Sequence, residues 1–433
     1  MKRKGDEIES AHLPRDAAEK LARRRLLLGS LIAAGGAVVG GTSRALGAPP
    51  PALGAPPAIP PWMQEPGWPV LKHPYGLPSR YEDAVVRRTL PSPIPQAGSA
   101  WTPLADLHGT ITPNGLFFVR DHAGTPQIDP AAHRLLVHGL VDRPMVFTMD
   151  DLTRFPAVSA THFHECSGNT FQDWAKPKAK TVQFTHGLLS CCEWTGVLLE
   201  TILGETGVKP DATWILAEGA DAAAMDRSVP LADALQIGAM LAFAQNGEHL
   251  RPEQGFPLRL VLPGFEGNMN IKWLRRLKLM TEPAMTKEET AYYTDLLPSG
   301  KARGFTFVME AKSVITRPSG GQRLPEPGFH EISGLAWSGR GRITRVDVSV
   351  DAGESWRTAA LQQPVLSRCL TRFRLPWRWE GGSAVLQSRA IDETGYVQPT
   401  LKELVAVRGV NSFYHNNAVQ PWRVAASGEV SNV

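Results

Sequence analysis

The hydrophobic pattern of the chain changes near Phe305, and this change constrains the fold more than any other feature. Upstream of it, short β-like runs are mixed with helical segments. The runs lie at residues 116–120, 134–138 and 259–262, and a typical helical segment lies at 231–239. This mixture predicts an α+β domain.

After Phe305 the pattern indicates a series of strands. Residues 345–350 alternate between polar and apolar, residues 351–353 (Asp-Ala-Gly) supply a turn, and residues 384–391 form a further candidate strand. We therefore predict an immunoglobulin-like β-sandwich. Because a chain of 433 residues exceeds what one compact core usually serves, we place the α+β domain at 91–285 and the sandwich at 286–425.

The N-terminal segment, residues 1–45, resembles a twin-arginine signal peptide. Residues 23–28 read Arg-Arg-Arg-Leu-Leu-Leu, and a small apolar run at 29–41 precedes a plausible cleavage site at Ser43-Arg44-Ala45. Glycines interrupt that run, which is shorter than the ~20 residues of a spanning helix, so we expect no permanent membrane anchor. A twin-arginine route carries folded proteins, which predicts a periplasmic location and hints at a cofactor inserted before export.

Residues 46–90 are rich in Pro, Ala and Gly, and they include Pro49-Pro50-Pro51. This composition favours an extended tether. The formal charge is only +4, from 46 Lys and Arg against 42 Asp and Glu, and the basic residues are scattered beyond the N-terminal cluster. We therefore expect no nucleic-acid partner.

Four cysteines are present, at positions 166, 191, 192 and 369, and they form no CxxC pair, no CxxCH haem attachment and no zinc spacing. Any haem is therefore expected on another protein. Adjacent Cys191 and Cys192 rarely bridge each other because the geometry is strained, and we interpret both as small core residues.

The most informative segment is 162–170, His-Phe-His-Glu-Cys-Ser-Gly-Asn-Thr. Cys166 directly precedes Ser-Gly-Asn, where a turn can hold its sulfur clear of the backbone, and a thiolate suits a soft or high-valent metal. A zinc site built from His162, His164 and Cys166 is the alternative, although no further ligand pair has the usual spacing.

Several separate segments match one family in order. The chain resembles the sulfite oxidases from about Pro103 to Val424, and its last motifs resemble their C-terminal dimerisation domain. The matching segments are 117–122 (FFVRDH, for FxRNH), 165–169 (ECSGN, for the CAGN cysteine loop), 246–248 (NGE), 255–259 (GFPLR, for GxPxR), 271–274 (IKWL, for KWL), 336–339 (AWSG) and 408–410 (RGV).

The resemblance implies a molybdopterin cofactor whose dithiolene supplies two sulfurs to molybdenum, with Cys166 supplying a third. A guanidinium and an ammonium suit its anionic phosphate. Gln254 stands where the family commonly has a histidine five residues before the arginine of GxPxR. The implied cofactor contacts are Phe118, Arg120 and His122 beside the pterin, Asp221 as an acidic pterin contact, and Arg259, Asn270 and Lys272 around the phosphate.

For catalysis, the resemblance implies that Arg120 faces the oxyanion substrate, that Tyr293 is the active-site tyrosine and that Arg408 is a second arginine reaching the pocket. Each has a simpler interpretation. Arg120 could form a surface ion pair, Tyr293 could pack in the core, and Arg408 could pin the domain interface.

One departure from the family bears on the substrate. Thr170-Phe171 follow Asn169, where the animal enzymes carry an arginine pair, and a missing cation disfavours a small dianion such as sulfite. Together with residues 293–295 and 300–316, this resembles the molybdenum subunits of sulfane dehydrogenases in periplasmic thiosulfate oxidation. That resemblance implies sulfane sulfur on a carrier protein as substrate, a dihaem c-type cytochrome partner, and a homodimer of this chain within a heterotetramer.

Three alternatives stay open. A periplasmic sulfite dehydrogenase would use the same cofactor on free sulfite. A reductase of protein methionine sulfoxide usually lacks the C-terminal sandwich, so the strands after Phe305 count against it. A noncatalytic immunoglobulin-like binding protein would contain no stoichiometric molybdenum.

Overall fold

The structure is a computed structural model that describes residues 59–64, 66, 69, 72 and 75–433. The predicted signal at 1–45 and the first part of the tether lie outside the described residues. Residues 78–433 form one unit, and the segment before it forms another. In the described part of the chain, no helix has the length and apolar character needed to cross a membrane.

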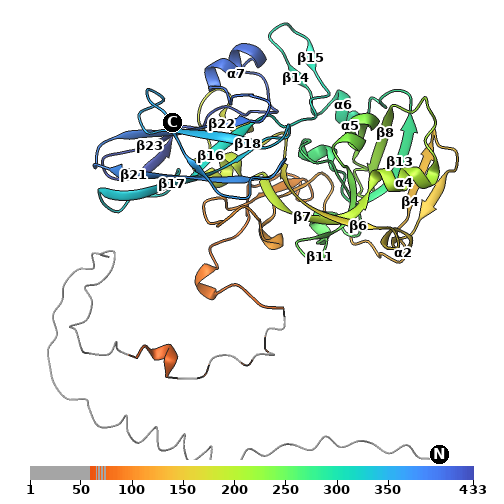
Figure 1. Cartoon of the computed structure of the whole chain (residues 1–433), viewed down its shortest axis with the longest axis horizontal. Helices are drawn as coiled ribbons and strands as arrows, with labels where there is room; N and C mark the ends of the chain where they lie inside the picture. The colour runs from red at the N-terminus through yellow and green to blue at the C-terminus, as the bar shows by residue number, and fades with distance from the viewer. Residues whose placement is uncertain (1–58, 65, 67–68, 70–71, 73–74) are drawn as a thin grey trace, which may run out of the picture. The chain divides into compact units, whose positions relative to one another are not determined.

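The first half of the unit contains two five-stranded sheets with short helices (Figure 1). One sheet has the order β11-β10-β7-β6, with β12 paired to β10, and the other has the order β5-β4-β13-β8-β9. The elements are β4 (Leu135–Gly139), β5 (Met145–Phe147), α2 (Met149–Thr153), β6 (Ala157–Glu165), α3 (Val182–His186), β7 (Leu189–Leu198), α4 (Leu199–Thr206), β8 (Trp214–Gly219), β9 (Asp226–Pro230), α5 (Leu231–Gln236), β10 (Met240–Gln245), β11 (Glu248–His249), β12 (Arg259–Val261) and β13 (Leu274–Met280).

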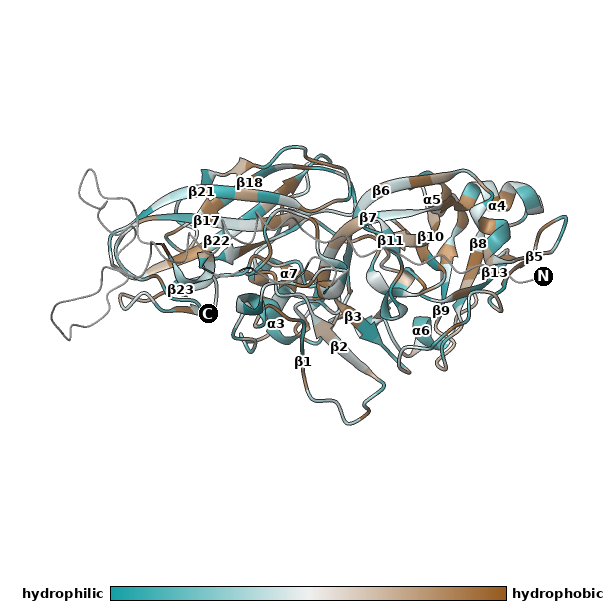
Figure 2. Cartoon of the chain, turned by 90° about the horizontal axis from the view of Figure 1, so that it is seen from below, coloured by the Kyte–Doolittle hydropathy of each residue, from teal (hydrophilic) through white to brown (hydrophobic). Residues whose placement is uncertain are grey.

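A buried core joins these two sheets and their helices. Leu135 on β4, Leu277 on β13 and Leu260 on β12 are all buried in it, together with Ile202 of α4. Figure 2 shows hydrophobic residues on β10 and β13. The predicted α+β domain is confirmed.

Two predicted boundaries differ from the structure. The run at 116–120 begins with a 3-10 turn, Asn114–Leu116, and only Val119–Asp121 forms a strand, β3, which pairs with β2 (Gly98–Trp101). The Leu116 N–H closes this turn by donating to the Pro113 carbonyl oxygen (2.8 Å), and the Asn114 side-chain amide donates to the Gln245 carbonyl oxygen (2.9 Å). The helix predicted at 231–239 ends at Gln236, since Gly238 takes a φ of +72°, which closes the helix.

The second half is a sandwich of two antiparallel sheets, which confirms the predicted fold class. The sheet orders are β16-β17-β21-β20 and β19-β18-β22-β23-β24. The elements are α6 (Lys287–Thr290), β14 (Asp295–Leu296), β15 (Ala302–Arg303), β16 (Lys312–Arg317), β17 (Gly328–Trp337), β18 (Ile343–Ser349), β19 (Arg357–Thr358), β20 (Ala360–Leu361), β21 (Thr371–Trp379), β22 (Ala384–Asp392), α7 (Leu401–Arg408), β23 (Trp422–Val424) and β24 (Val430–Asn432).

The strands predicted at 345–350 and 384–391 correspond to β18 and β22, and Ala352 and Gly353 form the predicted turn with positive φ. The sandwich continues to β24, beyond residue 425. The hydrophobic core of the sandwich continues into the first half. Phe163 of β6 and Cys191 of β7 are buried in the same cluster as Trp337 and Phe373 of the sandwich.

A buried ion pair crosses the boundary between the two halves. Glu165, the last residue of β6, accepts hydrogen bonds from Lys312 Nζ of β16 (2.9 Å) and from Trp337 Nε1 of β17 (2.6 Å). Asn169 Nδ2 donates to Glu165 as well (2.9 Å), and Lys312 Nζ also donates to Thr170 Oγ1 (2.8 Å). The ion pair therefore attaches segment 166–170 to the sandwich.

We predict that Lys312→Met strongly destabilises the protein, because the fully buried Glu165 would lose the cation that it is paired with. Removing one partner of a buried pair typically costs about 3–5 kcal/mol. Urea unfolding measures this loss, with the exposed Lys402→Met as the matched control. The double variant Glu165→Gln/Lys312→Met should recover part of the stability, and an unchanged midpoint for Lys312→Met would contradict the prediction.

Candidate functional site

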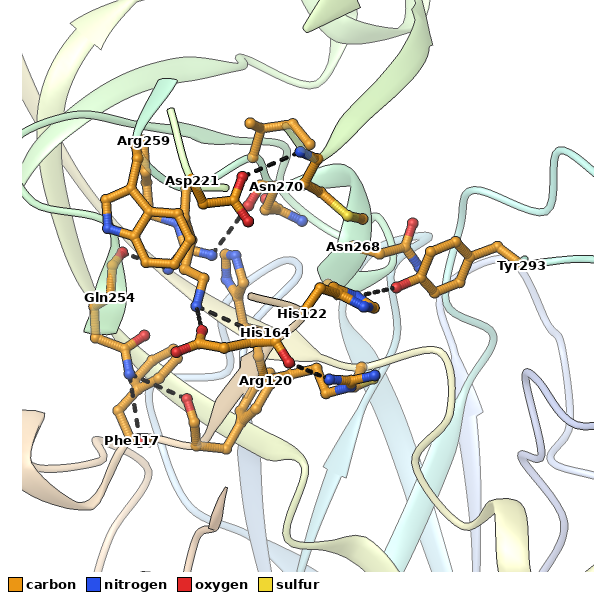
Figure 3. A pocket seen from close by; sticks show the side chains of 18 residues that line it. Phe117, Arg120, His122, His164, Asp221, Gln254, Arg259, Asn268, Asn270 and Tyr293 are labelled. Atoms are coloured by element: carbon orange, nitrogen blue, oxygen red, sulfur yellow. Dashed lines mark hydrogen bonds and ion pairs between the residues drawn. The ribbon is translucent and has the colours of Figure 1, made fainter. Parts of the chain in front are cut away.

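One pocket collects nearly all of the predicted site residues (Figure 3). Its lining combines apolar and aromatic side chains with a few charged and polar groups, which is typical of a site for a small organic ligand or cofactor. The predicted residues that line it are Phe118, Arg120, His122, Cys166, Asp221, Arg259, Asn270, Lys272 and Tyr293. The described residues that line the pocket do not include Arg408.

Cys166 reaches the pocket because β6 ends at Glu165 and the chain turns immediately. The Cys166 N–H donates to the Leu188 carbonyl oxygen (3.0 Å), and the Asn169 N–H donates to the Cys166 carbonyl oxygen (2.9 Å). Burial raises the pKa of the Cys166 thiol, and the Arg120 charge opposes this effect. A thiolate at neutral pH therefore needs a stronger positive charge than the chain itself supplies, as a bound metal ion would provide.

Arg259 is a buried cation on the pocket wall. Its Nη1 donates to the Gln254 carbonyl oxygen (3.0 Å) and its Nη2 to the Asn270 carbonyl oxygen (3.2 Å), but its Nε has no partner among the described residues. It forms no ion pair with any described carboxylate, and burial lowers its pKa to about 10. Since a buried charge without a counter-ion is costly, Arg259 is suited to an anionic ligand group.

Lys272 adds a second cation beside Arg259. Its Nζ pairs with Asp121 and donates to the carbonyl oxygens of Arg120 (3.2 Å) and Glu253 (3.0 Å). Burial lowers the pKa of Lys272, and Asp121 opposes that effect. The ammonium is thus held by the strand that carries Arg120.

The side chains of Asn270, Asp221 and Gln254 mainly form hydrogen bonds with backbone groups around the pocket. Asn270 Oδ1 accepts from the Leu262 N–H (2.6 Å), and its Nδ2 donates to the Glu266 carbonyl oxygen (3.0 Å). Asp221 Oδ1 accepts from the Met225 N–H (3.1 Å). Gln254 Nε2 donates to the Phe118 carbonyl oxygen (3.1 Å), so the residue that departs from the family pattern still borders the pocket.

His164 lines the pocket although the sequence suggested it only for zinc. It is buried, and neither ring nitrogen has a hydrogen-bond partner among the described residues. In that same part of the chain, no group of three His, Cys, Asp or Glu side chains could hold a metal ion. Its spacing of two from Cys166 on an extended segment is the signal that could have placed it in the pocket.

His122 and Tyr293 form a neutral pair, drawn in Figure 3. His122 Nε2 lies 3.0 Å from the Tyr293 hydroxyl oxygen. Burial, aided by the Arg120 charge, lowers the pKa of His122 to about 4. Burial raises the pKa of Tyr293, so its hydroxyl stays protonated. The pair can therefore supply a hydrogen-bond donor to the pocket without adding charge.

Arg408 contacts residues of the second half and is not among the described residues that line the pocket, whereas the prediction is that it reaches the pocket. It ends α7, and its Nη1 donates to the His415 carbonyl oxygen (2.7 Å). The His415 N–H in turn donates to the Ser167 carbonyl oxygen (2.8 Å), and its Nε2 lies 2.9 Å from Glu266 Oε2. In this structure Arg408 therefore acts on the cysteine loop through His415.

Arg227 of β9 is a site residue that the sequence did not indicate. It is buried and pairs with Glu266 (3.4 Å) and Glu289 (3.6 Å), while its guanidinium carbon lies 5.0 Å from the centre of the Tyr293 ring. Its neighbours in sequence carry no signal for these contacts. Only the packing of three segments that are separate in sequence brings them together.

The family models match both halves. Residues 122–288 match the oxidoreductase molybdopterin binding domain, and residues 303–421 match the Mo-co oxidoreductase dimerisation domain. Together with the cysteine loop and the cationic pocket wall, this defines the chain as a molybdopterin oxidoreductase.

The relatives identify the family. Mitochondrial sulfite oxidase of Mus musculus is 33% identical over 341 residues, and the match covers 72% of this chain and 62% of that one. Sulfite oxidase of Gallus gallus is 30% identical, covering 70% and 71%. This chain therefore belongs to the sulfite oxidase family, although it spans only about 62% of the length of the mouse relative.

A solved structure is more similar still. The crystal structure of the sulfane dehydrogenase SoxCD from Paracoccus pantotrophus matches at a TM-score of 0.85 and 48% identity, and the match covers 87% of this chain and 97% of that one.

We predict that acid destabilises the fold partly through His122. The pKa of His122 falls from 6.5 in the unfolded chain to about 4 in the folded protein. Between pH 6.5 and pH 4 the unfolded chain therefore binds more protons than the folded protein, so the free energy of unfolding decreases as the pH is lowered. His122→Asn should therefore lose less free energy of unfolding than the wild type between pH 6.5 and 4. Urea titrations at each pH measure this, the exposed His108→Asn is the control, and equal slopes would refute it.

Proposed function

We propose that this chain oxidises sulfane sulfur on a carrier protein in the periplasm and passes the electrons to a c-type cytochrome. The observation that carries the proposal is Phe171, an apolar residue beside the cysteine loop where the animal sulfite oxidases have a cation. The similarity to the sulfane dehydrogenase SoxCD supports it.

The residues present fit the molybdopterin cofactor. Arg259 offers a buried, unpaired cation for a phosphate, and His164 offers two unpartnered ring nitrogens inside the pocket. We assign Cys166 as the metal ligand. The other proposed cofactor contacts are Phe118, Arg120 and His122 beside the pterin, Asp221 as an acidic contact, and Asn270 and Lys272 beside Arg259 at the phosphate.

When bound, this cofactor supplies two-electron oxidation with oxygen transfer to sulfur. The chain itself supplies charge and orientation. Arg120 forms no ion pair with any carboxylate that the structure describes, so its guanidinium can hold a negative oxygen of the substrate. Tyr293 holds a proton at Oη, where His122 orients it. Arg408 then serves as a positioning residue through His415.

Aromatic rings pack against the loop that carries the proposed metal ligand, although they are not among the described residues that line the pocket. The rings of Phe171 and Phe413 lie 4.8 Å apart. A Cβ added at Gly168 would lie 3.3 Å from Phe413 Cε1 and 3.9 Å from Cys166 Sγ, so Phe413 packs directly on the cysteine loop. Asp295 Oδ1 fixes this ring by accepting from the Phe413 N–H (2.7 Å).

This apolar flank favours a bulkier and less charged sulfur species over a free dianion, because a dianion is best held by two or more cations. A protein-bound sulfane group meets that description. We further propose a homodimer through the dimerisation domain, within a heterotetramer with a dihaem cytochrome, and export through the signal at 1–45. The alternative, a sulfite dehydrogenase, draws support from the matched sulfite oxidases.

The decisive experiment compares two substrates on the purified holoprotein with its copurifying cytochrome. We expect turnover of a sulfane-bearing carrier protein, and a kcat/KM for free sulfite lower by at least roughly tenfold, a difference of about 1.4 kcal/mol. Rapid oxidation of free sulfite with cytochrome c, and none of the carrier, would reject the sulfane assignment in favour of sulfite.

Restoring the cation tests the role of Phe171 directly. Phe171→Arg should raise kcat/KM for free sulfite by roughly tenfold, because the new charge attracts the dianion. Phe171→Leu is the matched control, since it keeps the apolar character. Equal kcat/KM values for free sulfite in the two variants would show that charge at this position does not select the substrate.

Cys166→Ser should give a folded chain with little activity, because serine oxygen is a harder ligand than the thiolate. We expect a loss larger than the roughly 10–100-fold that altered outer-shell groups cause. Circular dichroism, molybdenum content and turnover measure the outcome, and Cys192→Ala is the control. Near wild-type turnover would remove Cys166 from its role.

A further inference from the structure

Two cysteines outside the pocket meet at the boundary between the two halves. The sulfur atoms of Cys191 and Cys369 lie 3.5 Å apart, and 178 positions separate the two residues in sequence. Both residues are buried in the shared hydrophobic core. Cys191 belongs to β7 of the first half, and Cys369 precedes β21 of the sandwich.

Hydrogen bonds fix both backbones next to each other. Cys191 lies opposite Phe163 in the β6–β7 pairing, and the Phe163 N–H donates to the Arg368 carbonyl oxygen (3.1 Å). On its other side, the Cys191 carbonyl oxygen accepts from the Thr112 N–H (2.7 Å). Since hydrogen bonds already hold the two main chains together, closing the sulfur–sulfur distance to the ~2.05 Å of a disulfide bond falls to the two side chains.

Cys192 provides a contrast within the same strand. Successive residues of a strand point to opposite faces, so Cys192 is buried in a different cluster, with Trp194. Its sulfur accepts a hydrogen bond from Gln245 Nε2 (3.3 Å). Of the two adjacent thiols, Cys191 is therefore the one that faces the sandwich.

We propose that Cys191 and Cys369 are a redox pair that closes into a disulfide between the two halves when the protein enters an oxidising compartment. The compartment rests on the export proposed above. In the reaction, a small disulfide is the oxidant. Both S–H bonds break, one S–S bond forms between Cys191 and Cys369, and the oxidant is reduced to two thiols that take up both protons and both electrons.

The disulfide would strengthen the boundary that holds the cysteine loop. Lys312 and His415 of the sandwich contact Glu165 and Ser167 across this same boundary. A bond that closes so long a loop stabilises the folded protein by limiting the unfolded chain. The oxidised protein therefore keeps the loop attached to the sandwich under conditions that separate the halves of the reduced protein.

The test first reduces the purified holoprotein with dithiothreitol, removes the reductant, treats the protein with oxidised glutathione and then measures thiols in denaturant. We expect the count to fall from four to two, a Cys191–Cys369 cross-linked peptide in mass spectrometry, and a thermal midpoint higher by roughly 2–6 °C. Dithiothreitol should reverse all three changes.

Variants assign the bond and separate it from catalysis. Cys369→Ala and Cys191→Ala should abolish the cross-link and the rise in midpoint, while Cys192→Ala should retain both and makes the peptide assignment unambiguous. Four titratable thiols after oxidation, or a cross-link that involves Cys166 or Cys192 in the wild type, would overturn the proposal. None of these readouts depends on turnover, so a wrong substrate assignment would leave them unchanged.

Discussion

The buried ion pair between Glu165 and Lys312 is the interaction on which the site depends. Glu165 is the residue before the proposed metal ligand, and its carboxylate is satisfied by Lys312 and Trp337 from the sandwich and by Asn169 from the loop itself. A buried carboxylate is tolerated only with such a complete set of partners. The position of Cys166 is therefore set jointly by both halves, and neither half alone holds the loop in this way.

The charge distribution of the pocket follows from burial. Arg259 has no described counter-ion, Lys272 is balanced by Asp121, and the His122–Tyr293 pair is neutral. The phosphate end of the proposed cofactor would thus meet fixed positive charge, and Arg120 lies in the same pocket. Phe171 and Phe413 pack on each other and on the cysteine loop beside it. Positive charge is therefore concentrated on the pocket wall proposed to bind the cofactor, while the rings proposed to disfavour a small dianion lie on the neighbouring loop.

The boundary between the halves is a shared core, and this explains several of its side chains. Strand β7 points Cys191 into the sandwich and Cys192 toward Trp194, so one strand contributes to two clusters. Arg408 fits the same pattern, since it supports the cysteine loop through His415 instead of lining the pocket. Its own hydrogen bonds stay within the second half, and it acts on the interface only through His415, which contacts Ser167 and Glu266.

The sequence by itself determined what local patterns and ordered motifs can encode. The change near Phe305 predicted the α+β domain and the sandwich. The motifs from 117–122 to 271–274 contain six of the predicted residues that line one pocket, and the family resemblance added Asp221, Asn270 and Tyr293. Only the tertiary structure decided which residues contact Glu165 and that Arg227 packs against the Tyr293 ring. It also decided that Arg408 does not line the pocket and that Cys191 lies next to Cys369. The physical reason is sequence distance. These contacts join residues as far apart as 147 and 178 positions, where no periodicity or propensity acts and only the packing of the two halves selects the neighbour.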